Sequence, residues 1–388
     1  MVKFRYVFYF FLLTLFCCKK PFDLPASSTK SSYLVVEGVI NSGSGPTVIK
    51  LSKTVQLNNK ITANPVLGAT VTVEGEQNSV YTLIDFNNNG NYESGDLNLP
   101  GNQKYRLSVK TSDGRQYLSD FVPVKPTPPI DSIGYTVKNK IVQLYANAHD
   151  PANNTRYYRW DYDETWEFHS RWASAWVYDS LSNAIVARTP AQQVYFCFGN
   201  DRSTNILLGS TANLSSDVVF QAPITSIPLT SEKVMSKYSI LVRQYAISVE
   251  AYQFYQKLAK NTEQLGSIFD AQPTELKGNI HSVTDPNEPV IGFLSITNIQ
   301  SKRIFIPVQA LTTELLTIYP YDCEQDTAAY DNGHHINTVL TELLSQPITH
   351  IPTSALGSNL PPTGFLYSSP LCVDCTLRGT TQTPDFWR

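Results

Sequence analysis

The chain has 388 residues, of which 42% are hydrophobic, 12% aromatic and only 16% charged, and its formal net charge is −3. Soluble domains usually contain about 25% charged residues, so this composition favours a β-rich protein outside the cytoplasm and excludes the clustered basic charge of a nucleic-acid-binding protein. The length leaves room for two or three domains, each with its own core.

Residues 1–17 have the pattern of a bacterial lipoprotein signal peptide. Lys3 and Arg5 form a basic start, and the uncharged apolar run over residues 6–17 is shorter than the roughly 20 residues that a membrane-spanning helix needs. The run ends in Leu-Phe-Cys17-Cys18, which resembles a lipobox with an aliphatic residue at −3 and a small one at −1. We predict cleavage after Cys17 and lipid attachment at Cys18. The alternative is an ordinary secretory leader with incidental cysteines.

Residues 18–32 are polar and contain two prolines, as expected of a tether between a lipid and a folded domain. Lysines at positions 19 and 20 follow the lipidated cysteine where an inner-membrane retention signal would place an acidic residue. We therefore predict that the protein is anchored by lipid in the outer membrane, on either its periplasmic or its extracellular face.

Short strand-like segments fill residues 33–124, where alternating apolar and polar residues are separated by Gly, Asn, Asp and Pro turns. Six or seven short strands in about 90 residues predict a small β-sandwich of the transthyretin or immunoglobulin kind. The proline-rich segment 125–129 marks a boundary between domains.

Residues 130–388 are predicted to form a larger β-rich domain with one main helix near 248–263. In that helix Ser248 is the expected N-cap, and Val249, Tyr252, Tyr255 and Leu258 share one face. The segments VIGFLSIT and SKRIFIPV are predicted to pair as a hairpin, followed by a loop-rich tail from Tyr319. The fold class is therefore mainly β.

Several segments of the chain occur together and in order: VVEGVI, VRQYAISVEAYQFYQKL, LGSIFDAQPTELKGNI, DPNEPVIGFLSI, SKRIFIPV and CVDCTLRGTTQTPDFW. With them the chain resembles a family of Bacteroidota outer-membrane lipoproteins known as domain of unknown function four-two-four-nine. The resemblance implies a lipid-anchored protein associated with a TonB-dependent outer-membrane barrel. It implies no catalytic residues.

Four cysteines remain beyond the leader, namely Cys197, Cys323, Cys372 and Cys375. An even number in an exported chain favours disulfides, and four cysteines allow three pairings. The C-x-x-C spacing of Cys372 and Cys375 also suits half a zinc site or a redox motif. For zinc, Cys197 and Cys323 would have to converge with the motif, and an oxidising compartment disfavours four free thiolates. For redox chemistry the motif should adjoin a βαβ unit, and it lies in a Pro- and Thr-rich tail instead.

A twelve-residue segment has oxygen-bearing side chains at the spacing of a calcium loop, with Gly90 at its sixth position. Only three of the side chains are carboxylates, so any calcium affinity would be weak. Because Asn-Gly is also a strong hairpin signal, a turn without metal is the alternative. The candidate ligands are Asp85, Asn87, Asn89, Asn91, Glu93 and Asp96.

Four of the five tryptophans lie between residues 160 and 176. On a strand, Tyr158, Trp160 and Tyr162 would share one face, while Arg159, Asp161 and Asp163 would share the other. These rings either fill a sandwich core or form a platform for a glycan or peptide ligand. The candidate ligand-binding residues are Trp166, Trp172, Trp176 and Tyr178.

The sequence contains no nucleophile elbow, H-E-x-x-H motif, phosphate loop or dinucleotide-binding glycine pattern. We therefore expect a protein that is not an enzyme and needs no cofactor, apart from the weak calcium candidate. The predicted function is a binding or accessory subunit of a TonB-dependent transport system. The alternative is a structural or adhesive lipoprotein of the cell envelope.

Overall fold

The computed structural model describes residues 32–55, 64–263, 276–312, 318–319, 321–331, 336–358 and 361–388. The predicted signal peptide, Cys18 and almost all of the tether lie outside these residues. The mainly β fold is confirmed, since strands dominate and helices are few. Within the described ranges, no helix combines the length and the apolar character needed to traverse a lipid bilayer.

The N-terminal part is a β-sandwich of two sheets around one apolar core. Its first sheet has the order β19 (Val290–Ile291), β1 (Leu34–Asn41), β2 (Thr47–Lys53) and β5 (Asn91–Ser94), with β20 (Ile296–Thr297) also paired to β1. Its second sheet has the order β18 (Ile280–Ser282), β7 (Gln116–Ser119), β6 (Lys104–Lys110), β3 (Thr70–Gly75) and β4 (Val80–Leu83), with β8 (Val122–Pro123) paired to β6. Buried and exposed side chains alternate along strand β2, where Ile49 and Leu51 point into the core while Val48 and Lys50 are exposed.

A later segment of the chain completes this sandwich. Strands β19 and β20 pair in parallel with β1, with Leu34 opposite Val290 and Ile40 opposite Ile296. The predicted hairpin between VIGFLSIT and SKRIFIPV is therefore wrong, because the second segment is β21 (Gln300–Pro307) and pairs with β17 (Lys237–Ala246) instead. The segment VIGFLSIT stays apart from β21 because Val290, Leu294 and Ile296 are buried in the N-terminal core. Residues 33–124 are thus one part of the sandwich, and 280–297 supply the rest.

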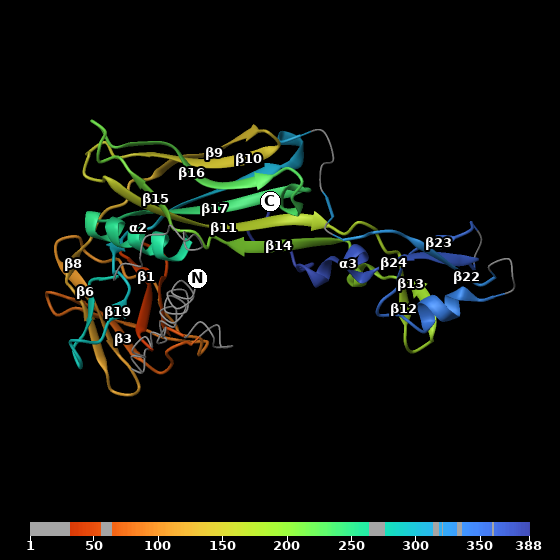
Figure 1. Ribbon diagram of the computed structural model, residues 1–388, viewed down its shortest axis with the longest axis horizontal. Coiled ribbons are helices and arrows are strands. Elements are labelled where there is room, and N and C mark those ends of the chain that lie inside the picture. The colour runs from red at the N-terminus through yellow and green to blue at the C-terminus, as the bar shows by residue number, and fades with distance from the viewer. Residues whose placement is uncertain are drawn as a thin grey trace, which may run out of the picture.

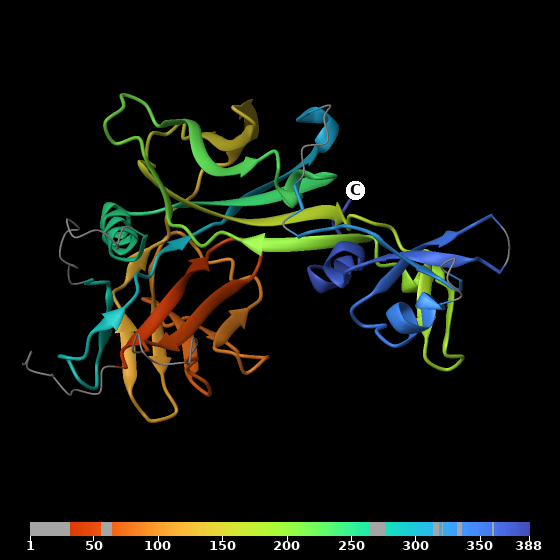
Figure 2. The ribbon, with the colours of Figure 1, turned by 45° about the vertical axis from the view of Figure 1, so that its right-hand side comes forward.

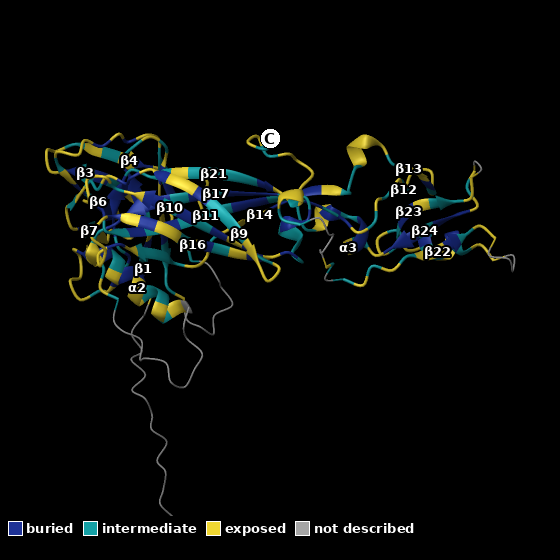
Figure 3. Ribbon diagram, turned by 90° about the horizontal axis from the view of Figure 1, so that it is seen from above, coloured by how far each residue is buried: buried dark blue, intermediate teal, exposed yellow. Residues whose placement is uncertain are grey.

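A second sandwich, also of two sheets, lies against the first (Figure 1). Its smaller sheet has the order β16 (Val218–Pro228), β10 (Ile141–His149) and β9 (Ile130–Lys138). Its larger sheet has the order β14 (Phe196–Arg202), β11 (Tyr157–His169), β17 and β21, with β15 (Leu207–Ser210) pairing the start of β11. The facing strands β10, β11 and β17 carry most of the buried residues of this part (Figure 3).

Helix α2 (Val249–Glu263) follows β17 directly and packs where the two sandwiches meet. Its predicted cap is confirmed, because the backbone N–H of Ala251 donates to Ser248 Oγ at 3.1 Å. Three residues of the predicted apolar face, Tyr252, Tyr255 and Leu258, pack in the core there, whereas the fourth, Val249, is exposed. Phe254, which was not predicted, is buried with them. The helix is anchored by contacts with Val39 of β1 and Tyr245 of β17, and these contacts set its orientation.

A small distal lobe extends from the far end of the larger sheet (Figure 2). It contains the hairpin β12 (Trp176–Asp179) and β13 (Ala184–Ala187) and a sheet of order β22 (Asp326–Ala329), β24 (Gly364–Ser368) and β23 (Ile351–Leu356). The predicted loop-rich tail therefore holds three strands. Short helical turns complete the described structure: η1 (Pro190–Gln192), η2 (Glu232–Val234), η3 (Val308–Ala310), η4 (Val339–Leu344), α3 (Pro370–Val373) and η5 (Cys375–Leu377).

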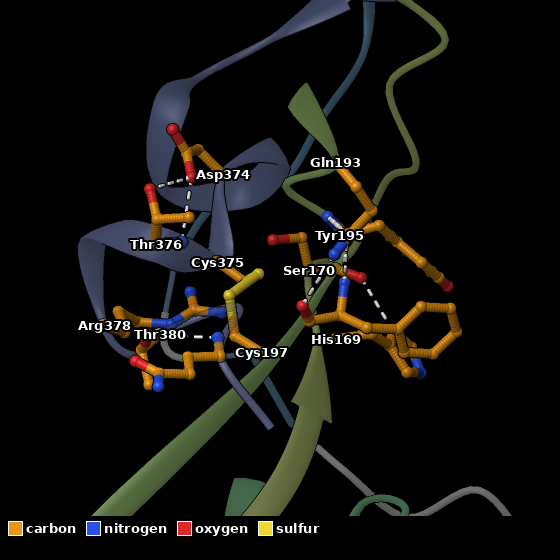
Figure 4. Close-up of a disulfide and its surroundings, with 12 residues drawn as sticks. His169, Ser170, Gln193, Tyr195, Cys197, Asp374, Cys375, Thr376, Arg378 and Thr380 are labelled. Atoms are coloured by element: carbon orange, nitrogen blue, oxygen red, sulfur yellow. Dashed lines mark hydrogen bonds between the residues drawn. A yellow bond between two sulfur atoms is a disulfide. The ribbon is translucent and has the colours of Figure 1, made fainter. Parts of the chain in front are cut away.

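The four cysteines form two disulfides, Cys197–Cys375 and Cys323–Cys372. The C-x-x-C motif is thereby split, since each of its cysteines joins a different partner. Cys197 lies in β14, so its bond ties the C-terminal segment to the larger sheet beside Ser170 and Arg378 (Figure 4). The structure therefore confirms the prediction that the four cysteines form disulfides.

The end of the chain also returns to the larger sheet. The backbone of Thr380 exchanges two hydrogen bonds with Phe198 of β14. Trp387 then packs edge-on against the rings of Phe198 and Phe305, at centroid distances of 5.1 and 5.6 Å. The last residues therefore cover one end of the sheet and reinforce the Cys197–Cys375 link.

We predict that the double variant Cys197→Ala/Cys375→Ala lowers the free energy of unfolding by about 3 kcal/mol, because the lost crosslink spans 178 residues of chain. The matched variant Cys323→Ala/Cys372→Ala opens a loop of only 49 residues and should cost less. Urea unfolding of the two variants and the parent measures both values. A larger loss in the second variant would contradict the assignment.

Candidate functional site

Strand β11 places different chemistry on its two sides. Tyr158 and Trp160 are 0% and 2% exposed and lie in the core of the second sandwich, as the core alternative for the aromatic run predicts. Their polar atoms are satisfied, because Trp160 Nε1 donates to Gln244 Oε1 at 2.9 Å. The Trp160 ring lies close to the backbone of Gly209 in β15, where a Cβ would be only 2.6 Å from the ring, so this packing requires glycine. The intervening residues of β11 therefore face the N-terminal sandwich.

On that opposite face, β11 and β17 form a paired charge network. Asp161 lies directly across from Arg243 in the register, and Arg243 Nε donates to its carboxylate. The two Nη atoms of Arg243 also donate to both oxygens of Asp163, at 2.7 and 3.0 Å. The Tyr245 hydroxyl donates to Asp161 Oδ2 at 2.7 Å. Each of these ionic side chains is about a quarter exposed, so the network is largely shielded from water.

This network fixes the ionisation of its members. Burial acts to raise the pKa of the Asp163 carboxyl, but the hydrogen bonds and charge of Arg243, with Arg202 nearby, outweigh it and hold that pKa below its usual value. Burial and the neighbouring Asp161 carboxylate raise the pKa of the Tyr245 hydroxyl. The site therefore presents an ionised Asp163, a charged Arg243 and a protonated Tyr245 at neutral pH.

Arg159 is the neighbour of this network on β11, and it lies between two aromatic rings. Its guanidinium carbon is 4.8 Å from the centroid of Tyr245 and 4.9 Å from that of Tyr255 on α2. Its Nη2 reaches Asp161 Oδ2 only at 3.5 Å. The side chain is 18% exposed, so its orientation is fixed by packing.

Two adjoining cavities open at this face. One has a volume of about 800 Å³ and the other about 500 Å³, and both are lined by Gly38, Arg159 and Asp161. The larger lies between β1, helix α2 and the loop after β14, with Phe254, Tyr255 and Leu258 among its walls. We call the two together the Arg159 cleft. Each of the two cavities has a size and a mixed lining that are typical of a small-ligand site.

A third cavity, of about 730 Å³, lies on the other side of α2 between the linker and residues 277–279. Lysines 125, 257 and 277 lie at its edge with Glu250. It lacks the paired network of the Arg159 cleft, so we regard the cleft as the better candidate site.

Two of the predicted ligand-binding aromatics lie along the larger sheet and its continuation. Trp166 is partly buried against the second core, with Lys233 Nζ 5.0 Å from its ring centroid. Trp172 Nε1 donates to the carbonyl of Cys323 at 2.8 Å. Both tryptophans are therefore packed against other parts of the chain.

The other two belong to the distal hairpin. Trp176 packs edge-on against Phe365 at 5.2 Å, and the Tyr178 hydroxyl donates to Asn183 Oδ1 at 3.1 Å. The structure therefore does not bring the four predicted aromatics together, and none of them lines the Arg159 cleft.

Of the calcium-loop candidates, Asp85, Asn87 and Asn89 lie in the turn between β4 and β5, Asn91 and Glu93 lie in β5, and Asp96 follows it. Asp85 accepts hydrogen bonds from the backbone N–H groups of Asn89 and Gly90, at 3.1 and 2.9 Å. Gly90 has φ +83°, and a Cβ there would lie 2.7 Å from a β2 carbonyl, so the turn requires glycine. Asp96 instead accepts from Gly45 N of another loop at 2.8 Å. Across the described part of the chain, no three His, Cys, Asp or Glu side chains gather in a metal-binding arrangement.

The fold defines a protein of two packed β-sandwiches with a cleft at their junction. The model of a family described as "Domain of unknown function (DUF4249)" matches residues 19–303, and the chain belongs to that family. The match includes both sandwiches and the cleft, whereas β22, β23 and β24 lie beyond it. No curated protein matches the chain.

One solved structure with a detected likeness is that of a protein from Bacteroides uniformis named as a candidate carbohydrate-binding protein. It is 9% identical, and the alignment covers 56% of this chain and 90% of that chain with a TM-score of 0.16. At that score the likeness carries no argument about the function of this chain.

We predict that Arg243→Gln lowers the free energy of unfolding by about 2 kcal/mol at pH 7, because it leaves two shielded aspartates without their partner. The folded pKa of Asp163 is depressed, so the stabilisation is present above about pH 4 and is lost as pH falls through the folded pKa. The difference between parent and variant should therefore shrink below pH 4. Urea unfolding at several pH values measures it.

Lys50→Gln is the matched control, because Lys50 and Glu37 form an exposed pair with side chains 54% and 53% accessible. It should change the stability by less than about 1 kcal/mol at every pH. Equal losses in the two variants, or a loss in Arg243→Gln that does not shrink at any acidic pH, would show that the ionised network does not stabilise the fold.

Proposed function

We propose that this protein is a non-enzymatic, lipid-anchored binding protein of the outer membrane, which captures a small ligand in the Arg159 cleft as an accessory subunit of a TonB-dependent transport system. The observation that carries the proposal is the cleft itself, where two adjoining cavities share Arg159 and Asp161, and Arg243 and Tyr245 hold the Asp161 carboxylate in place. A rigid wall of this kind lowers the ordering cost of binding. Family membership and the lipobox support the proposed place and partner.

The chemistry of the cleft favours binding over catalysis. Acid–base catalysis needs a group that exchanges a proton near neutral pH. Asp163 is instead held ionised by Arg243, and the Tyr245 hydroxyl is held protonated by burial and Asp161. Such fixed charges and donors orient a ligand without exchanging protons with it.

We predict that Cys18→Ala releases the protein from the membrane, because it removes the thiol that receives the lipid. Cys17→Ala is the matched control, since it keeps a small residue at the −1 position and should leave the protein anchored. Fractionation and detergent partitioning of the two variants measure the anchor. Membrane retention of Cys18→Ala would overturn the lipid-anchor proposal.

We also predict that the tagged full chain, extracted from the outer membrane in mild detergent, copurifies with a TonB-dependent barrel in stoichiometric amount. Mass spectrometry of the purified material identifies the partner. Recovery of the protein alone across several detergents would contradict the accessory role and favour the structural or adhesive alternative.

A further inference from the structure

The Arg159 guanidinium has unused hydrogen-bonding capacity. An arginine has five N–H donors in a planar fork. Among the residues that the structure describes, Arg159 makes a side-chain hydrogen bond with Tyr255 and one long contact of 3.5 Å with Asp161, whereas Arg243 directs three donors to the two aspartates. Arg243 and Tyr245 already supply both Asp161 oxygens with donors. The aspartates therefore do not require Arg159.

The charges of the cleft leave a positive excess on that wall. Asp161 and Asp163 face Arg159 and Arg243, and Arg202 adds a third cation at 3.4 Å from Asp163 Oδ1. Glu37, which also lines the larger cavity, is paired with Lys50 at 2.8 Å. A shielded cation with spare donors at a cavity wall is complementary to an anion.

The form of this anion follows from how Arg159 is held. The rings of Tyr245 and Tyr255 lie on it and fix the guanidinium plane. A fixed planar fork matches the two oxygens of a carboxylate, which it binds through two parallel hydrogen bonds. The guanidinium lies where the two cavities meet, so a bound carboxylate would leave the rest of its molecule in the larger one.

The remaining lining indicates what that molecule is. Phe254 and Tyr255 supply aromatic surface, while residues 203–205, Ser-Thr-Asn, supply hydroxyl and amide groups. Ring faces beside short polar side chains suit a molecule with apolar faces and many hydroxyl groups, as a sugar ring has. We infer that the ligand of the Arg159 cleft is an acidic saccharide whose carboxylate binds Arg159. The inference rests on the proposed binding function of the same cleft.

The test is calorimetric titration of the detergent-solubilised full chain with disaccharides that contain glucuronate or galacturonate, each paired with its neutral counterpart. We expect the acidic form to bind at least about tenfold more tightly, the value of one charge-assisted hydrogen bond. In Arg159→Gln this preference should disappear, and in Arg159→Lys it should persist in part, because the charge remains and the fork is lost. Lys110→Gln, at the exposed end of β6 and outside the lining of both cavities, should retain the full preference.

The outcomes separate the ligand class from the binding function. Equal affinity for acidic and neutral forms, or a preference that survives in a folded Arg159→Gln variant, overturns the inference. If neutral sugars bind equally well and Tyr255→Ala removes their binding, the cleft remains a binding site and only the acidic class fails. If glutarate, a carboxylate without a sugar ring, binds as tightly as the uronates, or no disaccharide binds, the saccharide class is overturned.

Discussion

The structure depends on the alternation of side chains along β11, a strand of 13 residues that pairs with β14, β15 and β17. Successive residues of a strand face opposite sides of the sheet. Aromatic rings such as Trp160 can therefore fill the core of the second sandwich while Arg159 and Asp161 meet the first. One strand supplies the centre of a hydrophobic core and the wall of a binding cleft, and a shift by one residue would exchange the two.

The path of the chain after α2 places this charged face against a partner. Instead of continuing the second sandwich, the chain returns to pair β19 and β20 beside β1 before it enters β21. The two sandwiches are consequently linked by several crossings and by the contacts of Phe254 and Tyr255 on α2. The cleft lies among these elements, so its width is set by the core packing of both sandwiches.

Local patterns predicted the parts of the structure that local physics decides. The strand alternation of β11, the helix after Ser248 and the β-rich class could all be read from the sequence, because each rests on neighbours within a few residues. The partner of VIGFLSIT could not be predicted, since parallel pairing with β1 joins residues about 250 positions apart through burial in a shared core. For the same reason Arg159 and Asp161 were recognised as one face, but their relation to Arg243 and Tyr255 depends on tertiary contacts.

The two disulfides are nested, with Cys323–Cys372 lying inside the interval closed by Cys197–Cys375. In an oxidising compartment, a chain that joined its cysteines in order of synthesis would link Cys197 to Cys323 and Cys372 to Cys375. Both native bonds instead use the two cysteines of the Cys372–Cys375 motif. Correct crosslinking can therefore be completed only after Cys375 has been synthesised, and a product that stops before it would retain free or mispaired thiols by which it could be distinguished from the finished protein.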